Sequence, residues 1–170
     1  MPTLIQRSPQ ELAVTLDEVG EDAELVQQIE TSDSRARSYQ LRYERPRTFD
    51  TLRSGPVTVF NRVLVARDLT TAQQLFAEQV ALTDSFPEAR VPVGDPFVLD
   101  EGPVGDEAQG LAACVNSCNS DEEIFVHKRL VSRVDNVVSV VYLWGLSDPE
   151  GTTAWQARYF SALVEGRARA

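Results

Sequence analysis

The chain has 170 residues, of which 42% are hydrophobic and 25% are charged, and this composition excludes a disordered, collagen-like or membrane-spanning protein. Its length fits one domain of ordinary size. The formal net charge of −10 at pH 7 repels nucleic-acid backbones and anionic membranes, so neither is an expected partner.

The first predicted element is a helix that begins after Ser8. Ser8, Pro9 and Glu11 have the spacing of a capping box with proline at the first helical position, and Gly20 ends the helix. Residues 1–7 precede this signal, and we expect them to form a flexible arm.

The first half of the chain then predicts three strands and a second helix. The strands lie over residues 23–31, 39–44 and 57–67, with a loop over residues 47–55. Apolar residues on both sides of the third strand indicate that both of its faces are buried. A helix capped by Asp68 or Thr70 follows, with apolar residues recurring every three or four positions.

Residues 87–107 are rich in proline, glycine and aspartate and predict a long connection. One short apolar segment, residues 97–99, interrupts it. A strand is predicted over residues 109–115, and the last helix follows Asp148 and Pro149.

A hairpin over residues 124–145 gives the clearest local signal. Asp135 and Asn136 tolerate the positive φ angles that a type I′ turn requires. A two-residue loop fixes the cross-strand register. One face then pairs Val134 with Val137, Ser132 with Ser139, Leu130 with Val141 and Lys128 with Leu143, and the other pairs Arg133 with Val138, Val131 with Val140, Arg129 with Tyr142 and His127 with Trp144.

Together these elements predict an α+β fold. We expect a single antiparallel sheet of about six or seven strands with three helices packed against it. The domain should span residues 8–166, and residues 167–170 should form a frayed C-terminus.

The rare residues restrict the possible chemistry. His127 is the only histidine, which excludes zinc sites that need two or three imidazoles from one chain. Any Ser–His–acid or Cys–His catalysis would have to use this residue. The scattered glycines match no phosphate-binding loop, and the acidic groups match no calcium loop, so we expect neither a cofactor nor a metal.

The two cysteines, Cys114 and Cys118, flank asparagine and serine residues that favour a turn. A turn is needed to bring their Cα atoms within the ~7 Å that a disulfide requires. The sequence favours this disulfide over two free thiols and over a metal site built with His127 and a carboxylate.

One face of the predicted hairpin carries a candidate ligand-binding surface. His127, Arg129, Tyr142 and Trp144 place a titratable ring, a cation and two aromatic rings together. Such side chains bind small aromatic or anionic ligands through stacking and charge-assisted hydrogen bonds. The sequence favours the alternative, in which they form ordinary cross-strand pairs beneath a helix and their long side chains reach water.

Two short motifs carry a family resemblance. Residues 104–108 read Val-Gly-Asp-Glu-Ala, and residues 133–138 read Arg-Val-Asp-Asn-Val-Val. Over residues 8–166 the chain resembles a family of uncharacterised secreted or lipid-anchored bacterial domains from GC-rich lineages, whose hairpin motif has glycine where this chain has Asp135. The resemblance implies an extracytoplasmic α+β domain with an antiparallel sheet, and it implies no catalytic residues.

These observations lead to two hypotheses about function. The first is a non-catalytic cell-envelope or secreted domain that binds a small ligand or a protein partner, with no nucleic-acid partner and no transmembrane segment in the chain. The alternative is a small cytosolic or secreted enzyme that uses His127 with an acidic loop residue. The expected location is extracytoplasmic, and the alternative is the cytoplasm.

Overall fold

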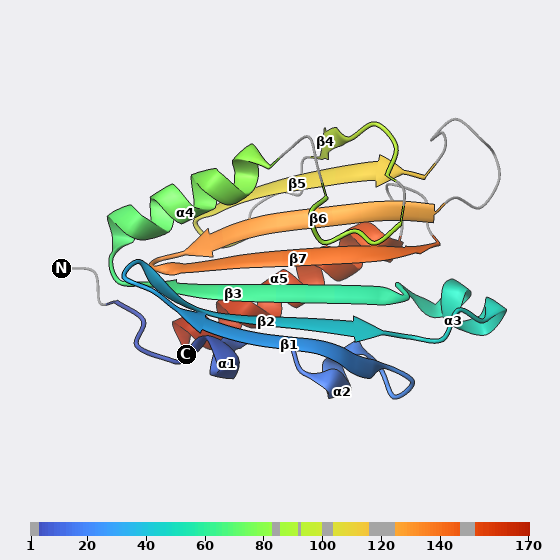
Figure 1. Ribbon diagram of the computed structural model, residues 1–170, viewed down its shortest axis with the longest axis horizontal. Coiled ribbons are helices and arrows are strands. Elements are labelled where there is room, and N and C mark those ends of the chain that lie inside the picture. Colours follow the sequence, from blue (N-terminus) through green and yellow to red (C-terminus); the bar gives the residue numbers. More distant parts are fainter. Residues whose placement is uncertain (1–3, 83–85, 92, 100–103, 116–124, 147–151) are drawn as a thin grey trace.

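The computed structural model describes residues 4–82, 86–91, 93–99, 104–115, 125–146 and 152–170. The described strands form one antiparallel sheet in the order β1-β2-β3-β7-β6-β5-β4 (Figure 1). The strands are β1 (Glu24–Ser32), β2 (Ala36–Glu44), β3 (Thr58–Ala66), β4 (Phe97–Leu99), β5 (Glu107–Cys114), β6 (Phe125–Val134) and β7 (Val137–Leu146). The predicted single antiparallel sheet is confirmed.

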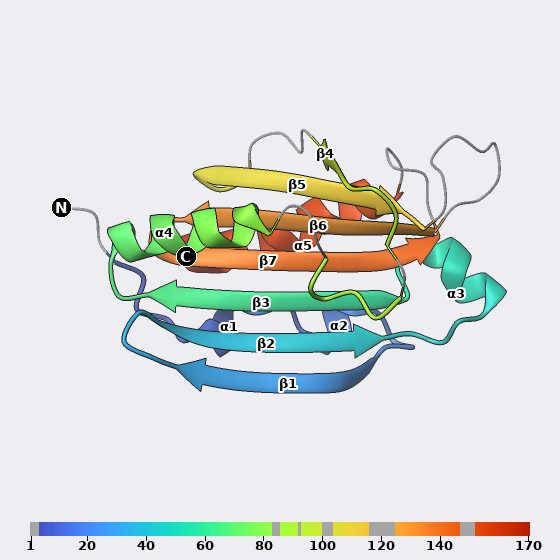
Figure 2. The ribbon, with the colours of Figure 1, turned by 45° about the horizontal axis from the view of Figure 1, so that its top comes forward.

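Helices pack against both faces of this sheet. The described helices are α1 (Pro9–Leu12), α2 (Leu16–Val19), α3 (Phe49–Ser54), α4 (Leu69–Ala81) and α5 (Thr152–Arg169). Helices α1 and α5 pack on one side, here called the α5 face, and α4 packs on the other, here called the α4 face (Figures 1 and 2). The α+β class is confirmed, with five described helices instead of the three expected.

The central strands β3 and β7 are buried on both faces, as predicted for residues 57–67. On the α5 face they contribute to a core that includes Val63, Val141, Leu143, Phe160 and Val164. On the α4 face the core includes Phe60, Leu64, Leu75, Val138 and Val140. Each face therefore has its own apolar layer, and each layer is covered by one long helix.

The hairpin of β6 and β7 has the predicted register at every position. Val134 pairs with Val137, and the alternation continues to His127 opposite Trp144. Asp135 has a φ of 48°, but Asn136 is not among the described residues with positive φ. The two-residue turn is therefore not the expected type I′ turn, which requires positive φ at both positions.

The two motifs that carry the family resemblance contact each other at this turn. Asp106 Oδ2 accepts a hydrogen bond from Asp135 N at 2.7 Å, and Glu107 Oε1 accepts one from Arg133 Nη2 at 2.6 Å. Gly105 has a φ of 68°, and a Cβ there would lie 2.4 Å from Arg133 O. Glycine is therefore required for the first motif to approach the hairpin this closely.

The helix predicted from Ser8 to Gly20 is divided into α1 and α2. The Ser8–Glu11 capping box forms as predicted, but Ala13 and Thr15 adopt extended backbone angles between the two helices. Fully buried Asn61 accepts a hydrogen bond from Val14 N at 3.0 Å, so strand β3 binds a donor that a continuous helix would use internally. This contact is distant in sequence, which explains why the local pattern did not indicate it.

The segment 47–55, predicted as a loop, contains the short helix α3. Thr48 is its N-cap, and Thr48 Oγ1 accepts a hydrogen bond from Thr51 N at 3.3 Å. The correction is a local one, because a helix of six residues is too short to leave a periodic apolar signal.

Both ends of the described chain contact the domain. In the segment expected as a flexible arm, Ile5 N donates to Asn136 Oδ1 at 2.7 Å. At the other end, α5 continues through Arg169, and Arg167 Nη1 donates to Ala13 O at 2.7 Å. Residues 167–169 belong to this helix, and Arg167 Nη1 also donates to Leu12 O at 3.3 Å, where α1 ends.

The left-handed turn leads to a stability prediction. We expect Asp135→Gly to leave the free energy of unfolding within about 1 kcal/mol of the parent, because glycine adopts this φ without steric cost. Asp135→Val should lose about 1–2 kcal/mol, because a Cβ-branched side chain is strained there. Urea denaturation of the two variants measures the difference, and equal losses would contradict this reading of the turn.

Candidate functional site

The structure places His127, Arg129, Tyr142 and Trp144 together on the α4 face of β6 and β7. All four are buried, with exposed fractions of 0%, 2%, 1% and 7%. His127 Nδ1 lies 2.8 Å from the Tyr142 hydroxyl, and burial raises the pKa of Tyr142 above its ordinary value. A role for these residues in ligand binding remains a prediction.

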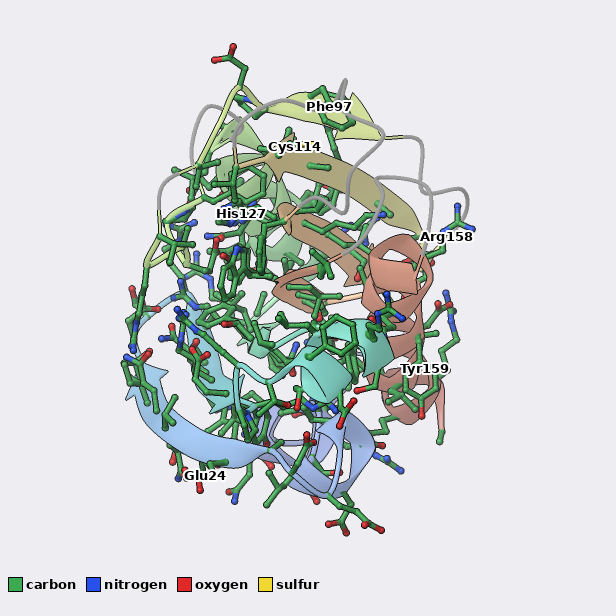
Figure 3. All side chains as sticks on the ribbon, turned by 90° about the vertical axis from the view of Figure 1, so that its right-hand side faces the viewer. Glu24, Phe97, Cys114, His127, Arg158 and Tyr159 are labelled. Atoms are coloured by element: carbon green, nitrogen blue, oxygen red, sulfur yellow. The ribbon has the colours of Figure 1, made fainter. Side chains whose placement is uncertain are left out.

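An aromatic side chain from the long connection covers part of this group. The ring of Phe86 lies 5.7 Å from His127 and 6.2 Å from Tyr142, measured between ring centroids. Figure 3 shows His127 in the interior, on the side of the sheet away from Tyr159 of α5. His127 therefore lies in a packed aromatic layer beneath residues 86–91.

Arg129 forms a buried ion pair rather than an open recognition site. Its Nε donates to both carboxylate oxygens of Glu88, at 3.1 and 3.2 Å. Its Nη1 and Nη2 donate to Gln79 O and Oε1, at 2.7 and 3.0 Å. Arg129 thus joins the sheet to the last turns of α4 and to the segment 86–91.

Beside this ion pair, the α4 face contains a cavity of about 370 Å³, here called the arginine pocket. Its polar side chains come from β1, β2, β3, α4 and the segment 86–91. The lining includes Arg42, Arg62, Gln79, Glu88 and Arg90. Glu88 is the one carboxylate among the described residues that line it.

The arginines of this pocket differ in how their charges are balanced. Arg42 Nε donates to Glu44 Oε1 at 2.7 Å, and Arg42 Nη1 donates to Glu88 O at 2.7 Å. Half-buried Arg62 donates from Nε to Ser38 Oγ at 3.2 Å and has no carboxylate partner within the described ranges. Burial lowers the pKa of the Arg62 guanidinium, and the charge of Arg129 lowers it further, whereas Glu88 opposes these effects.

Arg90 lies at the exposed side of the same pocket. Its Nη2 donates to Gln27 Oε1 at 3.3 Å, and it too forms no ion pair with a described carboxylate. Two guanidinium groups with unused hydrogen-bond donors therefore line one cavity. Arginine is suited to such a position because its planar group binds carboxylates and phosphates through two parallel hydrogen bonds.

A second cavity of about 310 Å³, here called the tryptophan pocket, is lined by Trp144 and Tyr142. The guanidinium carbon of Arg47 lies 4.7 Å from the centroid of the Trp144 ring, and Phe125 stacks on Trp144 at 5.2 Å. Trp144 Nε1 is buried without a hydrogen-bond partner among the described atoms. Arg42 and Arg90 line both pockets.

The pairing of Cys114 with Cys118 stays a prediction. Cys114 is buried at the end of β5, near Phe97 of β4 (Figure 3), whereas Cys118 lies outside the described residues. Within the described ranges, no three or more His, Cys, Asp or Glu side chains are placed to hold a metal ion.

No sequence pattern indicates Arg42, Arg62 and Arg90 as a group. A signal was present for Arg62, which interrupts the apolar alternation of β3 on the same face as Phe60 and Leu64. Arg42 pairs with Phe60 across the sheet, but Arg90 comes from the long connection. Only the folded chain brings these three segments together.

Comparisons with known proteins identify the fold alone. No protein-family model and no curated protein matches the chain. The crystal structure of the extracellular domain of PknH from Mycobacterium tuberculosis is similar, with a TM-score of 0.64 and 13% sequence identity. The alignment covers 99% of this chain and 98% of that one. Among the described residues, no helix combines the length and the apolar character needed to cross a lipid bilayer.

The buried ion pair leads to a second stability prediction. Glu88→Gln should lower the free energy of unfolding by about 3–5 kcal/mol, because it leaves the Arg129 charge buried without its carboxylate. Urea denaturation at pH 7 measures this loss.

Glu78→Gln is the matched control, because Glu78 pairs with Arg35 at 2.7 Å on the surface, where both side chains are exposed. It should cost less than about 1 kcal/mol. If both variants lose the same small amount, the Arg129–Glu88 pair does not hold residues 86–91 in place.

Proposed function

We propose that this chain is a non-catalytic domain of the cell envelope, or a secreted domain, that binds a small anionic ligand in the arginine pocket. The observation that carries the proposal is the pair of guanidinium groups, Arg62 and Arg90, that line this cavity without carboxylate partners among the described residues. The same pocket would also bind a protein partner that inserts an anionic side chain into it.

The chemistry of the pocket favours an anion over other ligands. A partly desolvated guanidinium is stabilised by a nearby negative charge, and this stabilisation exceeds that available in bulk water. The Arg62 side chain meets this condition because it is half-buried and its pKa is lowered mainly by burial. Gln27, Gln40 and Gln79 add side-chain amides that can donate to ligand oxygens.

The net charge of the protein strengthens this argument. With 26 acidic and 16 basic residues, the chain repels anions on average. Arginines gathered in one cavity therefore oppose the overall charge of the molecule, and a binding site explains their position. A general electrostatic attraction to anionic surfaces does not.

The alternative enzyme would use His127 with an acidic loop residue. A catalytic histidine must reach the proton that it transfers, directly or through one water molecule. His127 is fully buried beneath Phe86, and it is not among the residues that line either the arginine pocket or the tryptophan pocket. The geometry thus supports the binding function better.

Two observations support an extracytoplasmic location. The fold is similar to that of an extracellular bacterial domain, and the motifs at residues 104–108 and 133–138 resemble those of secreted or lipid-anchored domains. A disulfide between Cys114 and Cys118 belongs to the same proposal, because such bonds persist in oxidising compartments.

Binding of inorganic phosphate tests the proposed site. We expect amide NMR signals of the α4 face to shift on titration with phosphate and not with sodium chloride of equal ionic strength. Arg62→Gln should weaken phosphate binding about tenfold, because it removes a charge-assisted hydrogen bond.

Arg67→Gln is the matched control for this titration. Arg67 is an exposed arginine that pairs with Asp68 at 3.1 Å and lines neither pocket. Its substitution should leave phosphate binding unchanged. Shifts that chloride reproduces, or a phosphate affinity that is unchanged in Arg62→Gln, would overturn the proposed site.

The proposed extracytoplasmic location is tested by cell fractionation and by thiol labelling. In the organism that produces it, we expect the protein outside the cytoplasmic fraction. Thiol labelling of the native protein should detect two fewer thiols than labelling after reduction. Detection in the cytoplasm with both thiols reactive would reject the extracytoplasmic proposal while leaving the anion site open to its own test.

A further inference from the structure

The tryptophan pocket adjoins the arginine pocket, because Arg42 and Arg90 line both cavities. A ligand bound near Arg90 can therefore contact the side chains of both cavities. Each cavity is several times larger than the ~30 Å³ share of one water molecule in the liquid. There is room in each for more than a single small ion.

The arginines of the tryptophan pocket again divide into two groups. Arg42 pairs with Glu44, and Arg45 pairs with Asp22 through two hydrogen bonds of 2.7 and 3.1 Å. Arg47 and Arg90 have no carboxylate partner in the part of the chain that the structure describes. Glu44, the carboxylate that lines this pocket, is already bonded to Arg42 and to Thr58 Oγ1.

Arg47 is held in a position that leaves its donors available. Its guanidinium carbon lies 4.7 Å from the centroid of the Trp144 ring, and this cation–π contact is made without a carboxylate partner among the described residues. The N–H groups point outward in the guanidinium plane, where a carboxylate or phosphate can accept two of them. Because Trp144 is itself packed against Phe125, the aromatic ring beneath Arg47 is supported by a second ring.

Three arginines without described carboxylate partners thus extend across the two pockets, with Arg62 in one, Arg47 in the other and Arg90 in both. We infer that the ligand is an elongated molecule with at least two anionic groups, one bound by Arg62 and Arg90 and the other by Arg90 and Arg47. This inference rests on the proposed function, since it specifies the ligand class of the same site.

The shared chemistry is that of an oligophosphate or an oligocarboxylate. A ligand with one anionic group can fill only one of the two subsites, so its binding should not depend on Arg47. Linking two anionic groups makes the second contact intramolecular, and the affinity then rises without any new type of contact.

The test compares inorganic phosphate, inorganic triphosphate and citrate at fixed ionic strength. In a Trp155→Phe background, Trp144 is the single tryptophan, so its fluorescence reports on the Arg47 subsite. We expect triphosphate or citrate to bind at least tenfold more tightly than phosphate and to change Trp144 emission. The tighter of the two identifies the phosphoryl or the carboxylate class.

Arg47→Gln should remove this gain and bring the affinity for the longer anion close to that for phosphate. Because Arg47 is exposed, the substitution should not disturb folding, and Arg67→Gln again serves as the control. Arg62→Gln should weaken the binding of all three anions. Arg47→Lys, which retains the charge without the planar group, should give an intermediate affinity.

The results separate failure of this inference from failure of the proposed function. If Arg47→Gln binds the longer anion as well as the parent does, while Arg62→Gln does not, the second subsite is wrong and the anion site stands. If none of the anions binds, or if Arg62→Gln has no effect on any of them, both proposals are rejected.

Discussion

The buried ion pair between Arg129 and Glu88 is the contact on which the α4 face depends. Arg129 comes from β6, and through Glu88 and Gln79 it fixes the segment 86–91 and the end of α4 against the sheet. Glu88 O also accepts from Arg42, which lines both pockets. Without this ion pair, the wall of the arginine pocket would have few strong polar contacts with the strands beneath it. A buried charge pair here serves to position neighbouring groups, and it makes no large contribution to net stability compared with an apolar substitute of similar shape.

Local patterns were sufficient to predict the sheet and one of its registers. The two-residue turn at Asp135 and Asn136 leaves a single pairing of β6 with β7, and the structure has that pairing. By contrast, the break between α1 and α2 depends on Asn61, and the helical end at Arg167 depends on carbonyl groups at Leu12 and Ala13. Both contacts join residues far apart in the chain, so no window of neighbouring residues could indicate them.

At the candidate site, too, local sequence predicts some features, whereas others depend on contacts between distant residues. The predicted register correctly placed His127, Arg129, Tyr142 and Trp144 on one face, but sequence alone could not indicate that Phe86 and Glu88 would cover them. The pocket lies beside that group, where β2, β3 and the long connection meet. Its arginines stand at ordinary alternating positions or in a proline-rich segment, so their spacing in the sequence carries no motif. What distinguishes Arg62 and Arg90 is the lack of a carboxylate partner among the described residues, and this property appears only in three dimensions.

The contact between residues 104–108 and the β6–β7 turn has an evolutionary consequence. Gly105 leaves space for Arg133 O, Asp106 binds Asp135 N and Glu107 binds Arg133. A substitution in either motif therefore changes the selective constraint on the other, although about 25 residues separate them in the chain. Among homologous sequences, positions 107 and 133 should covary in charge, and a larger residue at position 105 should be accepted only together with a rebuilt hairpin turn. The residues of the two motifs would then change together among homologous sequences.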